Sequence, residues 1–300
     1  MTSPGDVPAA GRPRRVALAL GSGGARGYAH VGAVEVLHER GFEVVGIAGT
    51  SMGALVGGLS AAGRLSEFVA WARGLSQLDV VRLLAPTPRT TGAARVERVL
   101  AVLHELAGDV RIEDLPVPFT AVATDLHARR EVWFQRGPLD LAVRASIAIP
   151  GVVAPAVVDG RLLVDGGLLD PVPIAPLASV PADVRIAVDL GGGRGEGAVQ
   201  GAEATAEGPR SRLGRFDVMT LSLEAMQTVL TRYRLAGLPP DVLVTVPKDA
   251  CRSLDFHRAA EVIELGRTLT AQALDREGLT ARVPAPGQTT SSERLDSPIQ

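Results

Sequence analysis

Short apolar runs that alternate with helical patterns constrain the fold of this 300-residue chain more than any other feature. Runs typical of strands lie at residues 16–20, 44–48, 119–124, 132–135, 162–164, 185–190 and 242–246. Helical patterns lie at 27–40, 52–63, 65–75, 93–107, 138–145, 216–235 and 256–277. Apolar strands followed by helices are typical of a mostly parallel sheet covered on both faces. We therefore predict an α/β fold, with ligands bound at the C-terminal ends of its strands.

Three segments rich in Pro, Gly, Ser and Thr interrupt or flank this pattern. Residues 1–12 and 284–300 are predicted to be disordered tails on a single domain that spans 13–283. The glycine-rich stretch 191–211 is interpreted as a mobile loop inside that domain. Whether it is a lid or an insertion without a role stays open.

Charge and composition exclude several classes of protein. The formal net charge is −2 and no long basic run is present, so no nucleic-acid partner is expected. Cys251 is the only cysteine and no His or Cys cluster has zinc spacing, so no metal is expected.

The N-terminus does not have the pattern of a signal peptide. Basic residues precede the apolar "VALAL", but this run is shorter than the roughly 7–15 residues of a secretory core. No stretch approaches the ~20 apolar residues of a membrane span. We expect a cytoplasmic protein, with peripheral membrane contact left open.

A glycine loop, "GSGGARG", follows the first strand and precedes a helical pattern. Backbone N–H groups in such a loop can face an anion. The spacing of Gly21, Gly23 and Gly27 is one residue too long for a dinucleotide-binding G-x-G-x-x-G, and no Gly-Lys-Ser/Thr follows. No cofactor is therefore expected, and the oxyanion of an acyl-transfer intermediate is the better candidate anion.

Ser51 lies in "GTSMG", a G-x-S-x-G pattern between a predicted strand and a predicted helix. The pentapeptide alone is weak support, because a serine between glycines also suits an ordinary turn. Its context favours a nucleophile elbow, in which Gly49 and Gly53 let neighbouring segments pass without Cβ clashes.

A serine nucleophile needs a base, and no histidine after Ser51 has a distinctive loop setting. An acidic residue does, because "RLLVDGGLLDPVPI" places Asp165 directly after a short strand and before Gly166 and Gly167. A type I′ hairpin at this Asp-Gly pair is the alternative, and the residues alone leave it open.

Taken in order over residues 15–277, these segments resemble the bacterial patatin-like phospholipase family. The resemblance extends to "AVRASIAIPGVVAPAVVDGRLLVDGGLLDPVPI" and to the late "FHRAAEVIELGR". It implies a three-layer α/β/α sandwich with a mainly parallel central sheet and a Ser-Asp dyad without histidine. Carried over by position, the site consists of Ser51 as nucleophile, Asp165 as base, Gly23, Gly24 and Ala25 as oxyanion N–H donors, and Arg26 as a brace for their loop.

Two positions depart from the family pattern. Gly21 and Ser22 stand where many plant and animal relatives have Asp-Gly, which matters little if backbone donors do the work. Asp170 stands where bacterial relatives often have Asn, which changes the charge near Asp165.

The function expected from this resemblance is hydrolysis of lipid carboxylic esters through an acyl-enzyme. A broader carboxylesterase or acyl-CoA thioesterase with the same dyad is one alternative. A regulatory or lipid-binding protein with incidental activity is another. An acyl chain needs an apolar groove, and residues 65–86, including Trp71, are a candidate wall or cap, although ordinary core packing is favoured there. The oligomeric state is left unassigned.

Overall fold

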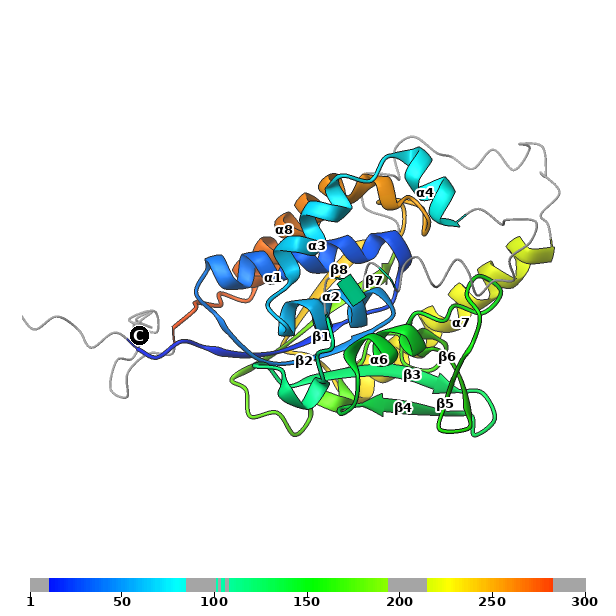
Figure 1. Cartoon of the computed structure of the whole chain (residues 1–300). Helices are drawn as coiled ribbons and strands as arrows, with labels where there is room; N and C mark the ends of the chain where they lie inside the picture. Colours follow the sequence, from blue (N-terminus) through cyan, green and yellow to red (C-terminus); the bar gives the residue numbers. More distant parts are fainter. Residues whose placement is uncertain (1–10, 85–100, 102–103, 106–107, 194–214, 283–300) are drawn as a thin grey trace, which may run out of the picture.

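The computed structural model describes residues 11–84, 101, 104–105, 108–193 and 215–282 (Figure 1). The tail at 284–300, most of the helix predicted at 93–107 and most of the loop predicted at 191–211 lie outside these residues. Within the predicted tail 1–12, Arg12 is described, and its guanidinium forms a salt bridge of 2.6 Å with Asp183.

All the described strands belong to one eight-stranded sheet. Its five parallel strands lie in the order β3 (Phe119–Asp125), β2 (Glu43–Thr50), β1 (Arg15–Leu20), β7 (Val184–Gly192) and β8 (Val242–Pro247). Antiparallel strands extend the β3 side, namely β4 (Arg130–Phe134), β6 (Arg161–Asp165) and β5 (Ala156–Val158). The predicted, mostly parallel α/β sheet is confirmed, and each predicted strand overlaps one of these.

Helices cover both faces of the sheet (Figure 1). The described α-helices are α1 (Ala29–Glu39), α2 (Met52–Ala61), α3 (Leu65–Arg73), α4 (Gln77–Leu84), α6 (Leu139–Ser146), α7 (Arg215–Gly237) and α8 (Ala259–Arg276). The pattern at 65–75 gave no sign of a second helix, α4, directly after α3. Among the described helices, none is long and apolar enough to cross a membrane.

The alternation of side chains along β1 explains how both faces are covered. The larger residues Val16, Leu18 and Leu20 pack in the main core with α1, α2 and α8. The small Ala17 and Ala19 belong to a second cluster with residues 172–177, against which Leu235 of α7 packs. Because both faces are buried, the strand shows a continuous apolar run instead of an alternation with polar residues.

β2 and β6 pair with successive parts of the same side of β3, and β4 pairs with the other side, so the ends of β2 and β6 meet. Thr50, the last residue of β2, pairs with Val122 of β3 in a parallel ladder. Asp165, the last residue of β6, pairs with the next residue, Ala123, in an antiparallel ladder. Ser51, which follows Thr50, therefore lies beside Asp165.

The Asp-Gly hairpin is at Asp159–Gly160, and the hairpin alternative for Asp165 is wrong. Asp159 and Gly160 have φ values of 49° and 74° and connect β5 to β6, as expected for the positive φ angles of a type I′ turn. Asp165 has a φ of −48° and begins a short 3₁₀ turn, Gly166–Leu168.

Candidate active site

Ser51 lies on a strained turn between β2 and α2. Its φ of 57° and ψ of −120° are uncommon for a residue with a side chain, and such strain concentrates at functional sites. Gly53 allows the turn to form, because a Cβ at this position would lie 2.0 Å from the carbonyl oxygen of Leu20. The Ser51 carbonyl accepts hydrogen bonds from the N–H groups of Ala54 and Leu55, which continue the turn into α2.

Ser146, at the end of α6, holds this turn through two hydrogen bonds. Its buried hydroxyl oxygen accepts the Ser51 N–H at 2.8 Å and donates its own proton to the Val122 carbonyl at 2.6 Å. The sequence analysis missed this residue, because nothing in "RASIAIP" distinguishes a serine that bonds main-chain atoms from one that merely fills space.

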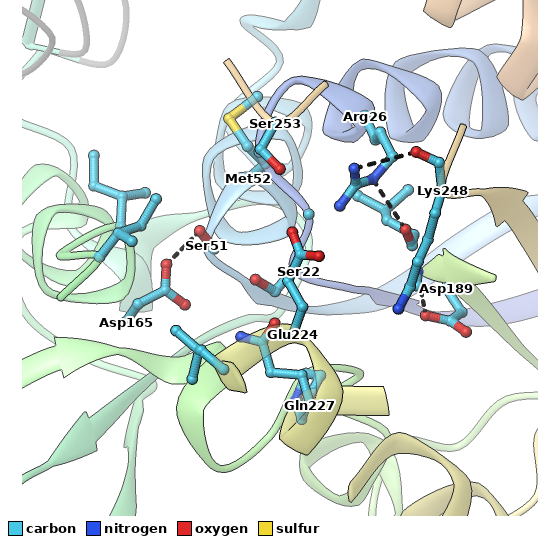
Figure 2. Close-up of a pocket in the computed structure, with 18 of the residues that line it drawn as sticks. Ser22, Arg26, Ser51, Met52, Asp165, Asp189, Glu224, Gln227, Lys248 and Ser253 are labelled. Carbon is cyan, nitrogen blue, oxygen red and sulfur yellow. Dashed lines mark hydrogen bonds between the residues drawn. The ribbon is translucent and has the colours of Figure 1, made fainter. Parts of the chain in front are cut away.

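The Ser51 and Asp165 side chains are joined by a buried hydrogen bond (Figure 2). The Ser51 hydroxyl donates to Oδ2 of Asp165 at 2.6 Å, and the two residues are only 2% and 5% exposed. The other carboxylate oxygen, Oδ1, accepts the Gly167 N–H at 2.7 Å. The carboxylate is thus held in one orientation, with Oδ2 directed at the serine.

Burial raises the pKa of Asp165 from 3.8 to about 6. The hydrogen bonds from Ser51 and Gly167 oppose this shift, because they stabilise the ionised form. A pKa of about 6 leaves the carboxylate mostly ionised at neutral pH and makes it a stronger base than an ordinary aspartate.

The glycine loop after β1 places free N–H groups beside this pair. Gly24 has a φ of 58°, and a Cβ there would lie 2.4 Å from the Ser253 carbonyl oxygen, so the loop requires glycine at this position. The prediction that Ala25 is an oxyanion donor is corrected by this structure, because its N–H already donates to the Ser253 carbonyl at 2.9 Å. The N–H groups of Gly23 and Gly24 have no hydrogen-bond partner among the described residues.

Arg26 fastens this loop to the C-terminal end of β7 and to the segment that follows β8 (Figure 2). Its guanidinium donates to the carbonyls of Leu190, Cys251 and Lys248 at 3.1, 3.3 and 3.5 Å. The side chain is 8% exposed, so these bonds compensate for much of the cost of its burial. These carbonyls belong to residues at least 164 positions away in the sequence, so Arg26 joins distant segments of the chain.

The fully buried His30 holds the start of the same loop. Its Nε2–H donates to the Gly21 carbonyl at 2.7 Å, and burial lowers its pKa to about 4. The ring is therefore neutral at physiological pH. Neither His30 nor any other described histidine is hydrogen-bonded to Ser51 or Asp165.

Asp170, the second departure from the family pattern, is directed toward α7. Its carboxylate is 1% exposed and lies 3.5 Å from the Arg234 guanidinium, which also pairs with Glu131. Burial raises the pKa of Asp170, and the charge of Arg234 opposes this shift. Its main-chain carbonyl accepts a hydrogen bond from the Thr50 hydroxyl at 2.8 Å, so Asp170 also contacts the residue before the elbow.

Ser51 and Asp165 open into a cavity of about 850 Å³, within the usual range for ligand pockets. One flank is apolar and is lined by Leu55, Phe68, Trp71, Leu75, Val80, Ile147, Ile149, Val152 and Val153. Another flank, called the polar flank below, carries the charged and polar residues Asp189, Glu224, Gln227, Thr228, Arg232 and Lys248. Apolar residues of the same helix α7 and of β8 also line the cavity, namely Met219, Leu223, Leu235 and Leu243. Residues 65–80 thus form part of the cavity wall, while Phe68 and Ala72 also pack in the core. The described residues contain no group of three or more His, Cys, Asp or Glu placed to hold a metal ion.

Comparison with known proteins defines the family of this chain. Residues 18–178, just over half of the sequence, match the family model described as patatin-like phospholipase. An NTE family protein of Mycobacterium tuberculosis is 46% identical over 330 residues, which cover 87% of this chain and 91% of the relative. The chain therefore belongs to the patatin-like phospholipase family, a family of lipid-hydrolysing enzymes.

Two more distant proteins are also similar to this chain. The lysophospholipase nte1 of Emericella nidulans is 28% identical over 302 residues, which cover 94% of this chain but only 19% of that protein. VipD from Legionella pneumophila, a solved structure, superposes with a TM-score of 0.48 at 13% identity, covering 88% of this chain and 67% of VipD.

Removing the Ser146 hydroxyl is expected to destabilise the turn that carries Ser51. Ser146→Ala leaves the buried Ser51 N–H without an acceptor, which costs about 1–3 kcal/mol of the free energy of unfolding. Urea denaturation at pH 7.5 measures this loss. Ser66→Ala, at an exposed position of α3, is the matched control and is expected to change stability by less than about 0.5 kcal/mol. Equal stability of the two variants would contradict the hydrogen bond.

The pKa of Asp165 also predicts a pH-dependent stability difference. An Asp that ionises at about 6 when folded and at 3.8 when unfolded destabilises the native state above pH 6, by about 3 kcal/mol, and not below pH 4. Asp165→Asn should therefore be more stable than wild type at pH 8, and this advantage should vanish as the pH falls to 4. Thermal unfolding across this range is the measurement.

Asp183→Asn is the control with the opposite sign. The Arg12 guanidinium and the Arg15 N–H hold the pKa of Asp183 below its usual range, so its charge stabilises the native state at pH 8. This variant should be less stable than wild type at pH 8. If both variants are less stable than wild type at pH 8, the buried Asp165 carboxylate does not destabilise the native state.

Proposed function

We propose that this protein hydrolyses carboxylic ester bonds of lipids, with Ser51 as nucleophile and Asp165 as general base. The observation that carries the proposal is the 2.6 Å hydrogen bond from the Ser51 hydroxyl to the buried Asp165 carboxylate, at the edge of a large cavity. Membership of a lipid-hydrolysing family supports the reaction class. The name of the fungal relative, a lysophospholipase, supports a phospholipase-type substrate.

In the first step, Ser51 Oγ attacks the ester carbonyl carbon and its proton passes to Oδ2 of Asp165. Negative charge develops on the carbonyl oxygen, which would accept hydrogen bonds from the N–H groups of Gly23 and Gly24. Each such donor contributes about 3 kcal/mol to lowering the barrier. The tetrahedral intermediate then collapses, and the proton on Asp165 goes to the departing alcohol oxygen, leaving an acyl-enzyme.

In the second step, a water molecule takes the place of the alcohol. Asp165 removes a proton from this water as its oxygen attacks the acyl carbon. The bond from this carbon to Ser51 Oγ then breaks, and Asp165 returns the proton to Oγ. The fatty acid leaves and both side chains recover their initial states.

The apolar flank of the cavity supports a long acyl chain as the acid part of the substrate. Leu55 follows Ser51 by one helical turn of α2, and Phe68 and Trp71 of α3 line the same flank with ring centroids 5.9 Å apart. Burying a methylene group contributes about 0.8 kcal/mol, so such a wall favours long-chain over short-chain esters.

Replacement of either member of the pair tests the proposed chemistry. Ser51→Ala should abolish labelling by a fluorophosphonate probe, and both Ser51→Ala and Asp165→Asn should reduce turnover of a long-chain ester at least 1,000-fold, since nucleophile or base is lost (about 4 kcal/mol). Ser60→Ala, on the same helix, is the matched control and should retain labelling and turnover.

Labelling that persists in Ser51→Ala, or full turnover by Asp165→Asn, would reject the dyad. The wild-type enzyme should also act faster on a lipid ester in micelles than on its monomers. Activity restricted to short soluble esters or to acyl-CoA would favour a broader esterase or thioesterase. Normal lipid binding without measurable turnover would favour a regulatory protein.

The pH dependence of activity follows from the pKa of Asp165. Only the ionised carboxylate can accept the Ser51 proton, so kcat/KM should rise with pH through a single ionisation near pH 6 and then reach a plateau. Steady-state kinetics between pH 4.5 and 8.5 measure this curve. A midpoint at 4 or below would show that Asp165, in the free enzyme, is not the buried base described above.

A further inference from the structure

Lys248 stands apart from the other cations of the chain. The sequence contains 31 Lys and Arg residues, and Lys248 is the only lysine among them. It follows the last residue of β8 and lines the polar flank of the cavity that contains Ser51. Lysine differs from arginine in carrying a compact ammonium with three donors on a flexible side chain. These donors can rotate to hydrogen-bond the oxygens of a tetrahedral anion.

The contacts of Lys248 leave part of its hydrogen-bonding capacity unused. Its ammonium donates to the Thr228 hydroxyl oxygen at 2.7 Å. This hydroxyl can only accept from Lys248, because its own proton is donated to the Glu224 carbonyl at 2.8 Å. The ammonium makes no other hydrogen bond with a described residue, so two of its three N–H groups remain available to a ligand.

Lys248 lies across the cavity from the reacting pair. In Figure 2, Ser51 and Asp165 lie on one side of the labelled residues, Lys248 and Asp189 on the other, and Glu224 and Gln227 between them. If the acyl chain occupies the apolar flank and its ester carbonyl is at Ser51, the alcohol part of the substrate extends toward Lys248.

We infer that Lys248, held by Thr228, binds the phosphodiester group in the alcohol part of a phospholipid or lysophospholipid substrate. This inference rests on the proposed ester hydrolysis at Ser51. A phosphate oxygen would accept the two unused N–H groups in charge-assisted hydrogen bonds. Lys248 is thus a specificity-determining residue that favours phospholipids over neutral glycerides.

The carboxylates near Lys248 restrict the charge of the phosphate group that can bind there. Asp189 and Glu224 line the same flank, and Oδ1 of Asp189 is fixed by the Gly191 N–H at 2.8 Å. The two cations of this flank, Lys248 and Arg232, are matched by these two carboxylates, so no excess positive charge favours a phosphate that carries two negative charges. The site therefore suits a phosphodiester with one charge better than a phosphomonoester.

A comparison of two substrates with the same acyl chain tests the inference. Palmitoyl lysophosphatidylcholine carries a phosphodiester, whereas palmitoyl glycerol carries none. Lys248→Met should lower the ratio of their kcat/KM values at least tenfold, mainly through a higher KM for the lysophospholipid. Lys248→Arg, which keeps the charge, should retain most of this ratio, and Arg276→Gln, which removes an exposed cation of α8 that does not line the cavity, should not change it.

Equal losses on both substrates in Lys248→Met would overturn the inference, because they would show that Lys248 only fastens β8 to α7. An equal drop in the ratio for Arg276→Gln would also overturn it, by showing a general effect of charge. Binding of lysophosphatidylcholine to Ser51→Ala, with and without Lys248→Met, separates the inference from the proposed catalysis. A Kd at least tenfold weaker with Lys248→Met supports the site even if turnover fails, and an unchanged Kd rejects it.

Discussion

The pairing of β2 and β6, end to end, with the same side of β3 is the constraint on which the rest of the site depends. Because β2 is parallel and β6 antiparallel to β3, the last residues of both strands reach adjacent positions, Val122 and Ala123. A shift of either strand by one residue would turn its side chains to the opposite face of the sheet. The Ser51–Asp165 hydrogen bond thus requires one register of β2 and one of β6 along β3.

The site combines several features that oppose folding. Ser51 has a positive φ, Asp165 is a buried carboxylate, and Arg26 is a buried cation whose guanidinium is satisfied by main-chain carbonyls. Each is tolerated because the surrounding core is extensive and tightly packed around β1 and β2. This distribution is typical of enzymes, in which a stable scaffold offsets the cost of a strained and desolvated site.

Local pattern was sufficient to predict the α/β class and every described strand except β5, whereas the pairing of Ser51 with Asp165 was expected only from the family resemblance. Local pattern was not sufficient to predict the hydrogen bonds made by main-chain atoms. Ala25 has the expected position, yet its N–H is bonded to Ser253, which is distant in sequence. Ser146 was missed for the same reason, because its partners come from other elements. The sequence marks Lys248 as the single lysine, but nothing in it places that side chain in the cavity. A hairpin at Asp165 was left open as an alternative although an equal Asp-Gly signal at Asp159 lies six residues earlier, and only strand pairing distinguishes the two.

The distance in sequence between Ser51 and Asp165 has a consequence for the newly made chain. They are 114 residues apart, and β3, with which the strands that carry them both pair, comes between them in the sequence. Contacts of such long range form late, after the entropy of closing the intervening loops has been paid. A chain that has folded only its first βα units carries the serine without its hydrogen-bonded carboxylate. On the proposed mechanism, completion of the sheet therefore couples activation of Ser51 to the finished fold.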